Sequence, residues 1–166
     1  MMKKDTRKLV LLSIFVASSM ILSYVESTLP PLFPQIPGIK IGLANIVVLL
    51  TLYLFSWKEA FFVSLIRVFA MALIFGNFMS FTYSLAGAVA SIFVMSLLKK
   101  IRIFSALGVS IAGALFHNAG QVAVAIFMLD TVEIGYYMIV LAVSGAVAGV
   151  LTGILAETLL KKVKMM

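Results

Sequence analysis

Two short polar segments lie within otherwise apolar sequence and hold the side chains best able to do chemistry. One runs from Pro37 to Asn45 (Pro-Gly-Ile-Lys-Ile-Gly-Leu-Ala-Asn) and the other from Phe116 to Gln121 (Phe-His-Asn-Ala-Gly-Gln). They supply an ammonium group, an imidazole and several amides, which can hydrogen-bond a polar or anionic ligand. Such groups are costly in an apolar surrounding unless they have partners. We therefore expect function to reside in these segments.

The second segment predicts a polar face on a helix. Gly113, His117 and Gln121 are four residues apart, so a helix places them on one face, whereas Asn118 points about 100° away toward a neighbour. His117 could be a neutral imidazole bonded to a carbonyl or to Asn45, a proton-coupling group or a ligand contact. The amides could equally join helices to one another. We expect the ligand-binding residues to be Lys40, Asn45, Arg67, Asn77, His117, Asn118 and Gln121.

Arg67 is the most informative single residue, because it lies within a long apolar stretch. It shares a helical stripe with Ala60 and Ser64, which predicts that it faces a seam of small residues. We expect no carboxylate at its depth. Four arrangements remain open for its guanidinium: snorkelling to the interface, bonds to backbone carbonyls, a long reach to Glu157, or contact with an anionic ligand. Lys40 would add a second cation.

The composition predicts an integral membrane protein. Of the 166 residues, 63% are hydrophobic and 11% are charged, which leaves too few polar side chains to coat a soluble domain. A spanning helix needs about 20 apolar residues. We expect a single transmembrane domain over residues 1–166, an all-α bundle of six transmembrane helices, at residues 9–25, 41–56, 60–76, 81–98, 104–129 and 135–160.

The basic residues predict the orientation of this bundle. With the N-terminus in the cytoplasm, eleven of the thirteen cations fall on the cytoplasmic side, while Lys40 falls outside and Arg67 lies within a span. We therefore expect a multi-pass protein of the cell membrane with both termini cytoplasmic. This topology also accounts for the net charge of +7, so no nucleic-acid partner is needed. The first span lacks a small-residue cleavage site, and we expect it to be a retained helix.

The segment between the first two helices contains all four prolines of the chain. Proline fixes its own φ and disfavours helix in the preceding residue, so residues 26–38 are expected to form a stiff extracellular connection. This connection could be a plain structural strap or a lid over an outward-facing pocket.

Small residues recur along several predicted helices and indicate close helix packing. The last helix has glycines at 145, 149 and 153, and the fourth and fifth helices have comparable stripes. Ser13 and Ala17 form a shorter stripe on the first helix, facing either this chain or another membrane subunit. There is no cysteine and one histidine, so we expect no metal, no cofactor and no catalytic residues.

The paired segments and the six-helix pattern resemble the family labelled both Gx transporter and heptaprenyl diphosphate synthase component I. The resemblance covers nearly the whole chain. In size, topology and small-residue first helix, this family is in turn similar to the substrate-binding S components of energy-coupling factor (ECF) transporters. The first label implies transport, and the second implies isoprenoid synthesis.

Chemistry weighs these implications against each other. Prenyl diphosphate synthases hold magnesium with paired aspartate-rich motifs, whereas Asp5 and Asp130 are the only aspartates here and are expected on opposite membrane faces. We therefore expect an ECF-type substrate-binding subunit, not an enzyme, that binds a small or amphiphilic solute from outside. Its partners would be a transmembrane coupling protein and ATPase subunits, with Ser13 and Ala17 at the docking seam. The alternative is a non-catalytic accessory subunit of isoprenoid or quinone synthesis or of electron-transfer machinery.

Overall fold

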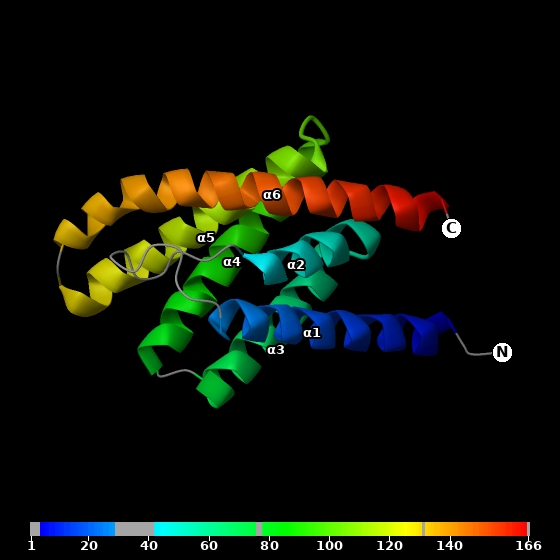
Figure 1. Cartoon of the computed structure of the whole chain (residues 1–166), viewed down its shortest axis with the longest axis horizontal. Coiled ribbons are helices and arrows are strands. Elements are labelled where there is room, and N and C mark those ends of the chain that lie inside the picture. Colours follow the sequence, from blue (N-terminus) through cyan, green and yellow to red (C-terminus); the bar gives the residue numbers. More distant parts are fainter. Residues whose placement is uncertain (1–3, 29–41, 76–77, 131, 166) are drawn as a thin grey trace.

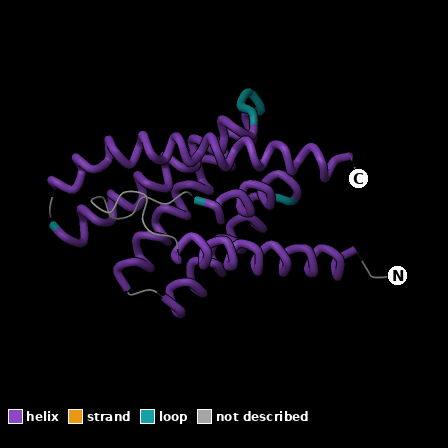
Figure 2. Tube along the Cα trace, in the orientation of Figure 1, coloured by secondary structure: helices purple, strands orange, loops and turns teal. Residues whose placement is uncertain are grey.

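The computed structural model describes residues 4–28, 42–75, 78–130 and 132–165, and over these ranges the chain is helical apart from short connections (Figures 1 and 2). No strand occurs within them. The elements in chain order are α1 (Lys4–Thr28), α2 (Leu43–Leu54), α3 (Trp57–Phe75), α4 (Phe78–Ile101), α5 (Ala106–Leu129), the 3-10 turn η1 (Val132–Tyr136) and α6 (Tyr137–Met165). The all-α prediction is therefore confirmed, with one α-helix close to each of the six predicted positions.

Within the described ranges, four helices are long and apolar enough to cross a membrane: α1, α4, α5 and α6. Helix α3, which is not among these four, has 19 residues and carries the charged residues Lys58, Glu59 and Arg67. In contrast, α2 has only 12 residues, about 18 Å at 1.5 Å per residue, against a hydrocarbon core of about 30 Å. The expectation that residues 41–56 form a complete span is not met, because the helix runs only from Leu43 to Leu54.

Helices α4, α5 and α6 pack closely through the glycines that the sequence singled out. A Cβ added at Gly149 would lie 2.7 Å from the Ile111 Cα, and one added at Gly120 would lie 2.8 Å from the Ala86 carbonyl oxygen. These distances are too short for any side chain, so α5 can approach both neighbours only at glycine. Ser110 Oγ and Thr152 Oγ1 add a buried hydrogen bond of 2.9 Å between α5 and α6. The predicted small-residue seams of α4, α5 and α6 are thus contacts within the bundle.

The short helix α2 lies at the centre of the other half of the molecule, against α1, α3 and α6 (Figure 1). Its side chains supply much of the core: Val48, Leu49 and Leu52 are each at most 2% exposed. A helix that is apolar on all sides is stable only when it is surrounded, which is the case here. The start of α2 therefore lies among other helices.

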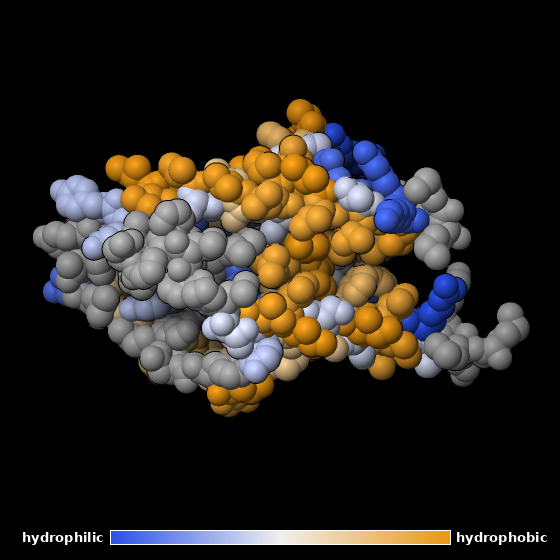
Figure 3. Space-filling model, viewed as in Figure 1, coloured by the Kyte–Doolittle hydropathy of each residue, from blue (hydrophilic) through white to orange (hydrophobic). Residues whose placement is uncertain are grey.

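Both termini lie at the same end of the molecule, and basic side chains gather there (Figures 1 and 3). We call this the basic end; its described cations are Arg7, Lys8, Lys58, Lys99, Lys100, Arg102, Lys161 and Lys162. Here Lys8 on α1 forms an ion pair with Glu59 on α3. Lys99 donates a hydrogen bond to the Leu52 carbonyl oxygen near the end of α2. A cation at a helix C-terminus satisfies its free carbonyls and its negative dipole end.

Candidate functional site

The candidate site is built around the first turn of α2. Gly42, with φ of 75°, precedes the helix in the left-handed conformation that glycine adopts without strain. Gly42 has no side chain to cap this helix start; its carbonyl oxygen accepts a 2.9 Å hydrogen bond from the Asn45 N–H, and its own N–H donates to the Glu26 carboxylate of α1. The first N–H groups of a helix point outward from its end and carry a partial positive charge. The start of α2 therefore directs hydrogen-bond donors into the bundle interior.

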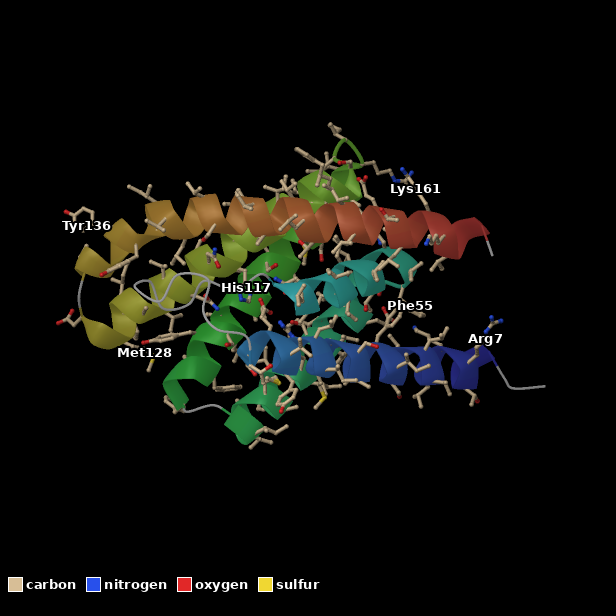
Figure 4. All side chains as sticks on the ribbon, viewed as in Figure 1. Arg7, Phe55, His117, Met128, Tyr136 and Lys161 are labelled. Carbon is tan, nitrogen blue, oxygen red and sulfur yellow. The ribbon has the colours of Figure 1, made fainter. Side chains whose placement is uncertain are left out.

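A small polar cavity adjoins this helix start, and we call it the central cavity. It has a volume of about 70 Å³. Five helices contribute its walls, which are Glu26, Gly42, Asn45, Arg67, Ala114, His117, Asn118, Gln121, Gly145, Ala148 and Thr152. Figure 4 shows His117 near the middle of the bundle, beside the start of α2. The cavity thus joins both polar segments of the sequence.

Arg67 supplies the guanidinium of the central cavity. Its Nη1 donates a hydrogen bond of 3.4 Å to the Ser23 hydroxyl on α1, whereas its buried Nε has no hydrogen-bond partner within the described ranges. Ser64 and Ala60, one and two turns earlier on the same stripe, are both buried. A buried donor without a partner costs about 1–3 kcal/mol. Arg67 therefore has unused capacity to bind an acceptor in the cavity.

One sequence-based expectation about Arg67 needs correction, and one of the four arrangements left open for it is not used. Glu26 lines the same cavity and attracts the guanidinium electrostatically, so a carboxylate does lie near it. The reach to Glu157 is not used, because Glu157 Oε1 accepts a 3.1 Å hydrogen bond from the Leu107 N–H at the start of α5. We missed Glu26 because we assigned it to the outer loop; α1 in fact continues to Thr28.

His117 and Gln121 form the shared polar face that their spacing predicts. The Gln121 Nε2 lies 3.1 Å from His117 Nε2, so the amide can donate to an unprotonated imidazole nitrogen. Gly87 on α4 makes room for the pair: a Cβ there would lie 3.0 Å from both His117 Cε1 and Gln121 Cγ. The imidazole and the amide are therefore held in place by α4 while they line the cavity.

Asn118 points to a different helix, as expected from its position on α5. Its Nδ2 donates a 2.7 Å hydrogen bond to the Leu141 carbonyl oxygen on α6. The side chain lies so close to Gly145 that a Cβ there would be 2.6 Å from the amide nitrogen. Asn118 thus joins two helices, and it also lines the cavity.

The structure brings five of the seven predicted ligand-binding residues to one cavity: Asn45, Arg67, His117, Asn118 and Gln121. Lys40 and Asn77 lie outside the described residues, as does the proline-rich segment from 29 to 41. The wall residues Glu26, Ala148 and Thr152 were missed, and the last two look like ordinary packing positions in the sequence.

Ser13 and Ala17 lie away from the central cavity and are exposed on α1. They line an open apolar groove of about 470 Å³ between α1 and α3, which we call the α1–α3 groove. The other helices do not cover this groove, so the Ser13 and Ala17 stripe differs from the intramolecular seams. Ser13 Oγ donates a 3.0 Å hydrogen bond to the Leu9 carbonyl oxygen in its own helix.

Comparison with known families places the chain. The family model described as heptaprenyl diphosphate synthase component I matches residues 15–159. The chain belongs to this family. No curated protein and no solved structure matches it.

The family match covers every wall of the central cavity. Resemblance to this family is therefore confirmed, whereas no match supports the further similarity to ECF S components. Chemically, the cavity of this family member offers a guanidinium, a helix N-terminus and amide groups around a small volume. Such an arrangement can hold one compact anionic or strongly polar group.

Proposed function

We propose that the chain is a non-catalytic membrane subunit of isoprenoid synthesis that binds the anionic head of a prenyl diphosphate or a similar amphiphile. The observation that carries this proposal is the meeting of two anion-binding elements in the central cavity. Arg67 has a buried Nε without a partner in the described ranges, and the start of α2, which has no N-cap side chain, adjoins the same space. The family description supplies the class of molecule.

Electrostatics favour an anion over a neutral ligand at this place. The N-terminus of a helix is equivalent to about half a positive charge, and a guanidinium adds a full one. Glu26 offsets part of this charge, since it is the carboxylate on the cavity wall. The remaining excess is positive and lies in surroundings that screen charge poorly. An acceptor-rich phosphate oxygen would satisfy both the Arg67 Nε and the first N–H groups of α2.

The size of the cavity limits what enters it. A volume of about 70 Å³ has room for a single small polar group and not for an isoprenoid chain. The apolar tail of the ligand would therefore lie outside the cavity. We propose that only the terminal phosphate enters, with Asn45, His117 and Gln121 orienting it, and that Lys40 and Asn77 contribute from segments outside the described residues.

The placement of the acidic groups supports a non-catalytic role. The resemblance implies that synthases bind magnesium through paired aspartate-rich motifs, but Asp5 is in the first turn of α1 at the basic end and Asp130 follows α5 at the other end. Neither lines the central cavity. The description "component I" itself implies at least one further subunit. We propose that catalysis resides in that partner.

We also retain the predicted membrane topology as part of the proposal. The basic end would face the cytoplasm, with both termini there, because cations are enriched in cytoplasmic loops. The central cavity would then open toward the outer half of the cell membrane. Helices α1, α3, α4, α5 and α6 would span, and α2 would be a half-helix with its N-terminus near mid-membrane. Half-helices of this kind direct their N-termini at anionic groups in membrane proteins.

Ligand binding by the isolated protein tests this function. The chain is reconstituted in phosphatidylcholine nanodiscs and titrated with farnesyl diphosphate and with farnesol, which share the apolar tail. We expect saturable binding of the diphosphate and at least tenfold weaker binding of the alcohol, because the alcohol lacks the charges that the cavity recognises. Equal affinity for both would contradict a head-group site.

The α1–α3 groove favours a second candidate function, that of a substrate-binding subunit of an ECF-type transporter. The groove is open and apolar, and Ser13 and Ala17 on its wall would let a partner helix approach closely. The partners would be a transmembrane coupling protein and its ATPases. Gentle purification followed by native mass spectrometry separates the candidates: ATPase subunits support transport, and a prenyl synthase subunit supports the first proposal.

A further inference from the structure

A second apolar groove lies between α3 and α4, on the other side of α3 from Ser13 and Ala17, and we call it the α3–α4 groove. Its volume is about 440 Å³, and its lining is mostly apolar. The two helices are in contact nearer their connection, where the Phe69 and Phe81 rings lie 4.9 Å apart. The groove occupies the part of the same seam toward the basic end. It is therefore a local gap in an otherwise packed interface.

The length of the groove corresponds to one leaflet of a bilayer. On α4 its lining extends over twelve residues, from Val89 to Lys100, or about 16 Å along the helix. Half of a hydrocarbon core of about 30 Å is about 15 Å. Phe93 and Leu97, which line it, are 70% and 50% exposed, so the groove is open to the side where lipid would lie. An occupant of this groove would therefore be a chain from a single leaflet.

Charged and aromatic groups mark one end of the groove as the head-group level. Lys100 and Trp57 line the groove at this end. The Lys58 Nζ lies 5.9 Å from the centroid of the Trp57 ring. Tryptophan and lysine concentrate where a membrane protein meets the lipid head groups. Lys99, one residue away, is instead bonded to the Leu52 carbonyl oxygen, so the two adjacent lysines have different tasks.

No carboxylate offsets this charge within the groove. Its lining contains no acidic residue, and the described residues form no ion pair with Lys100. Glu59, which directly follows Lys58 in the sequence, lines the α1–α3 groove and pairs with Lys8. The mouth of the α3–α4 groove is thus complementary to an anion, in contrast to the mouth of the α1–α3 groove.

Ser96 gives a further indication that something occupies this groove. Ser96 lines the groove, and its hydroxyl is buried with no hydrogen-bond partner in the part of the chain that the structure describes. Elsewhere in these helices hydroxyls donate to the preceding turn, as Thr51 does to Val47. Ser96 lies one turn in from Lys100, so its hydroxyl, once turned toward the groove, would find an acceptor in an ester oxygen just below a phosphate.

We propose that the α3–α4 groove binds one anionic phospholipid from the leaflet at the basic end. Its phosphate would contact Lys100 and Lys58, and one acyl chain would lie along the groove toward Val89. A phosphodiester suits these separate ammonium groups, whereas a diphosphate is better matched by a guanidinium fork such as that of Arg67. This site shares no residue with the central cavity, so it stands or falls independently of the proposed function.

Native mass spectrometry of protein released from nanodiscs tests this site. The nanodiscs contain equal amounts of phosphatidylglycerol and phosphatidylcholine with matched acyl chains. We expect one phosphatidylglycerol to be retained per chain, and Lys100→Gln to lower that retention about fivefold, the effect of one lysine near an anionic surface. Lys162→Gln removes a cation at the same end, on α6 away from the groove, and should retain the lipid as the wild type does.

Three outcomes would overturn the proposal. Equal retention of both lipids would show only annular lipid, and an equal loss in the Lys100 and Lys162 variants would show a diffuse charge effect. Farnesyl diphosphate is also added as a competitor. If it displaced the lipid from wild type but not from Lys100→Gln, the groove would be assigned to isoprenoids. Failure of farnesyl diphosphate to bind anywhere would contradict the proposed function and leave this lipid site intact.

Discussion

Arg67 and Ser23 lie across the α1–α3 interface with the guanidinium Nη1 3.4 Å from the hydroxyl oxygen. This long hydrogen bond positions the arginine without exhausting it, since Nε has no partner in the described ranges. The nearby Glu26 is bonded to the Gly42 N–H at the start of α2. One cation, one helix start and one carboxylate therefore meet at the cavity that we propose as a head-group site.

Gly87→Ala should disturb this site from α4. The new Cβ would lie 2.7 Å from the His117 carbonyl oxygen, which belongs to the α5 backbone and cannot move alone. Overpacking of this kind costs about 1–3 kcal/mol, and α5 must shift together with the cavity wall. We expect a lower midpoint of SDS-induced unfolding and weaker farnesyl diphosphate binding.

Gly108→Ala is the matched control for that substitution. The nearest atom to its added Cβ is a Phe104 side-chain carbon at 3.5 Å, an ordinary contact. Alanine favours helix over glycine by up to about 1 kcal/mol, so the unfolding midpoint should stay or rise. If Gly87→Ala behaved like Gly108→Ala, the α4–α5 contact would be looser than described.

Asn118→Ala should lower stability more than it lowers ligand affinity. The substitution removes the 2.7 Å hydrogen bond to the Leu141 carbonyl oxygen, and such interhelical bonds contribute about 0.6 kcal/mol in membrane proteins. Gln121→Ala removes a cavity group whose bond to His117 lies within one helix, so it should weaken binding with less effect on unfolding. If Asn118→Ala mainly weakened binding and Gln121→Ala mainly lowered stability, Asn118 would be the ligand contact and Gln121 the structural amide.

Much of the fold could be predicted from apolar segments and glycine spacing. Hydropathy located all six helices because each has an apolar surface. The four-residue glycine repeat of the last helix predicted close packing but not its partner, which is α5. The helix at α2 was predicted but its shortness was not, since composition cannot show that Gly42 would start the helix inside the bundle. Glu26 was missed for a related reason: its depth depends on how far α1 continues, which its last turn does not reveal.

The ion pair at the basic end predicts an acid-dependent loss of stability. Hydrogen bonds from Lys8 and then Ser56 lower the pKa of Glu59, in the first turn of α3, from 4.5 to about 2. A carboxylate with a lowered pKa stabilises the folded state fully above its unfolded value, and this stabilisation is lost as the pH falls from about 4.5 to about 2. Wild type should therefore lose thermal stability over this range more steeply than Glu59→Gln.

The Lys8→Gln variant serves as a second check on that pair. It leaves Glu59 ionisable but removes the larger cause of the pKa shift. Its melting temperature should lie below that of wild type at pH 7 and converge with it near pH 2. If the melting temperatures of wild type and both variants changed with pH in the same way between pH 2 and 7, the Lys8–Glu59 contact would contribute nothing to stability.

The most direct test of the central claim is the affinity of farnesyl diphosphate for Arg67→Met, measured in phosphatidylcholine nanodiscs beside Arg102→Met. Methionine keeps the apolar stem of arginine and removes the charge, and Arg102 is an exposed residue of the basic end that lines no part of the cavity. A lost charged hydrogen bond of about 1.5–3 kcal/mol predicts at least tenfold weaker binding for Arg67→Met. Wild-type affinity is expected for Arg102→Met. Unchanged affinity in Arg67→Met would contradict an anion site at the central cavity.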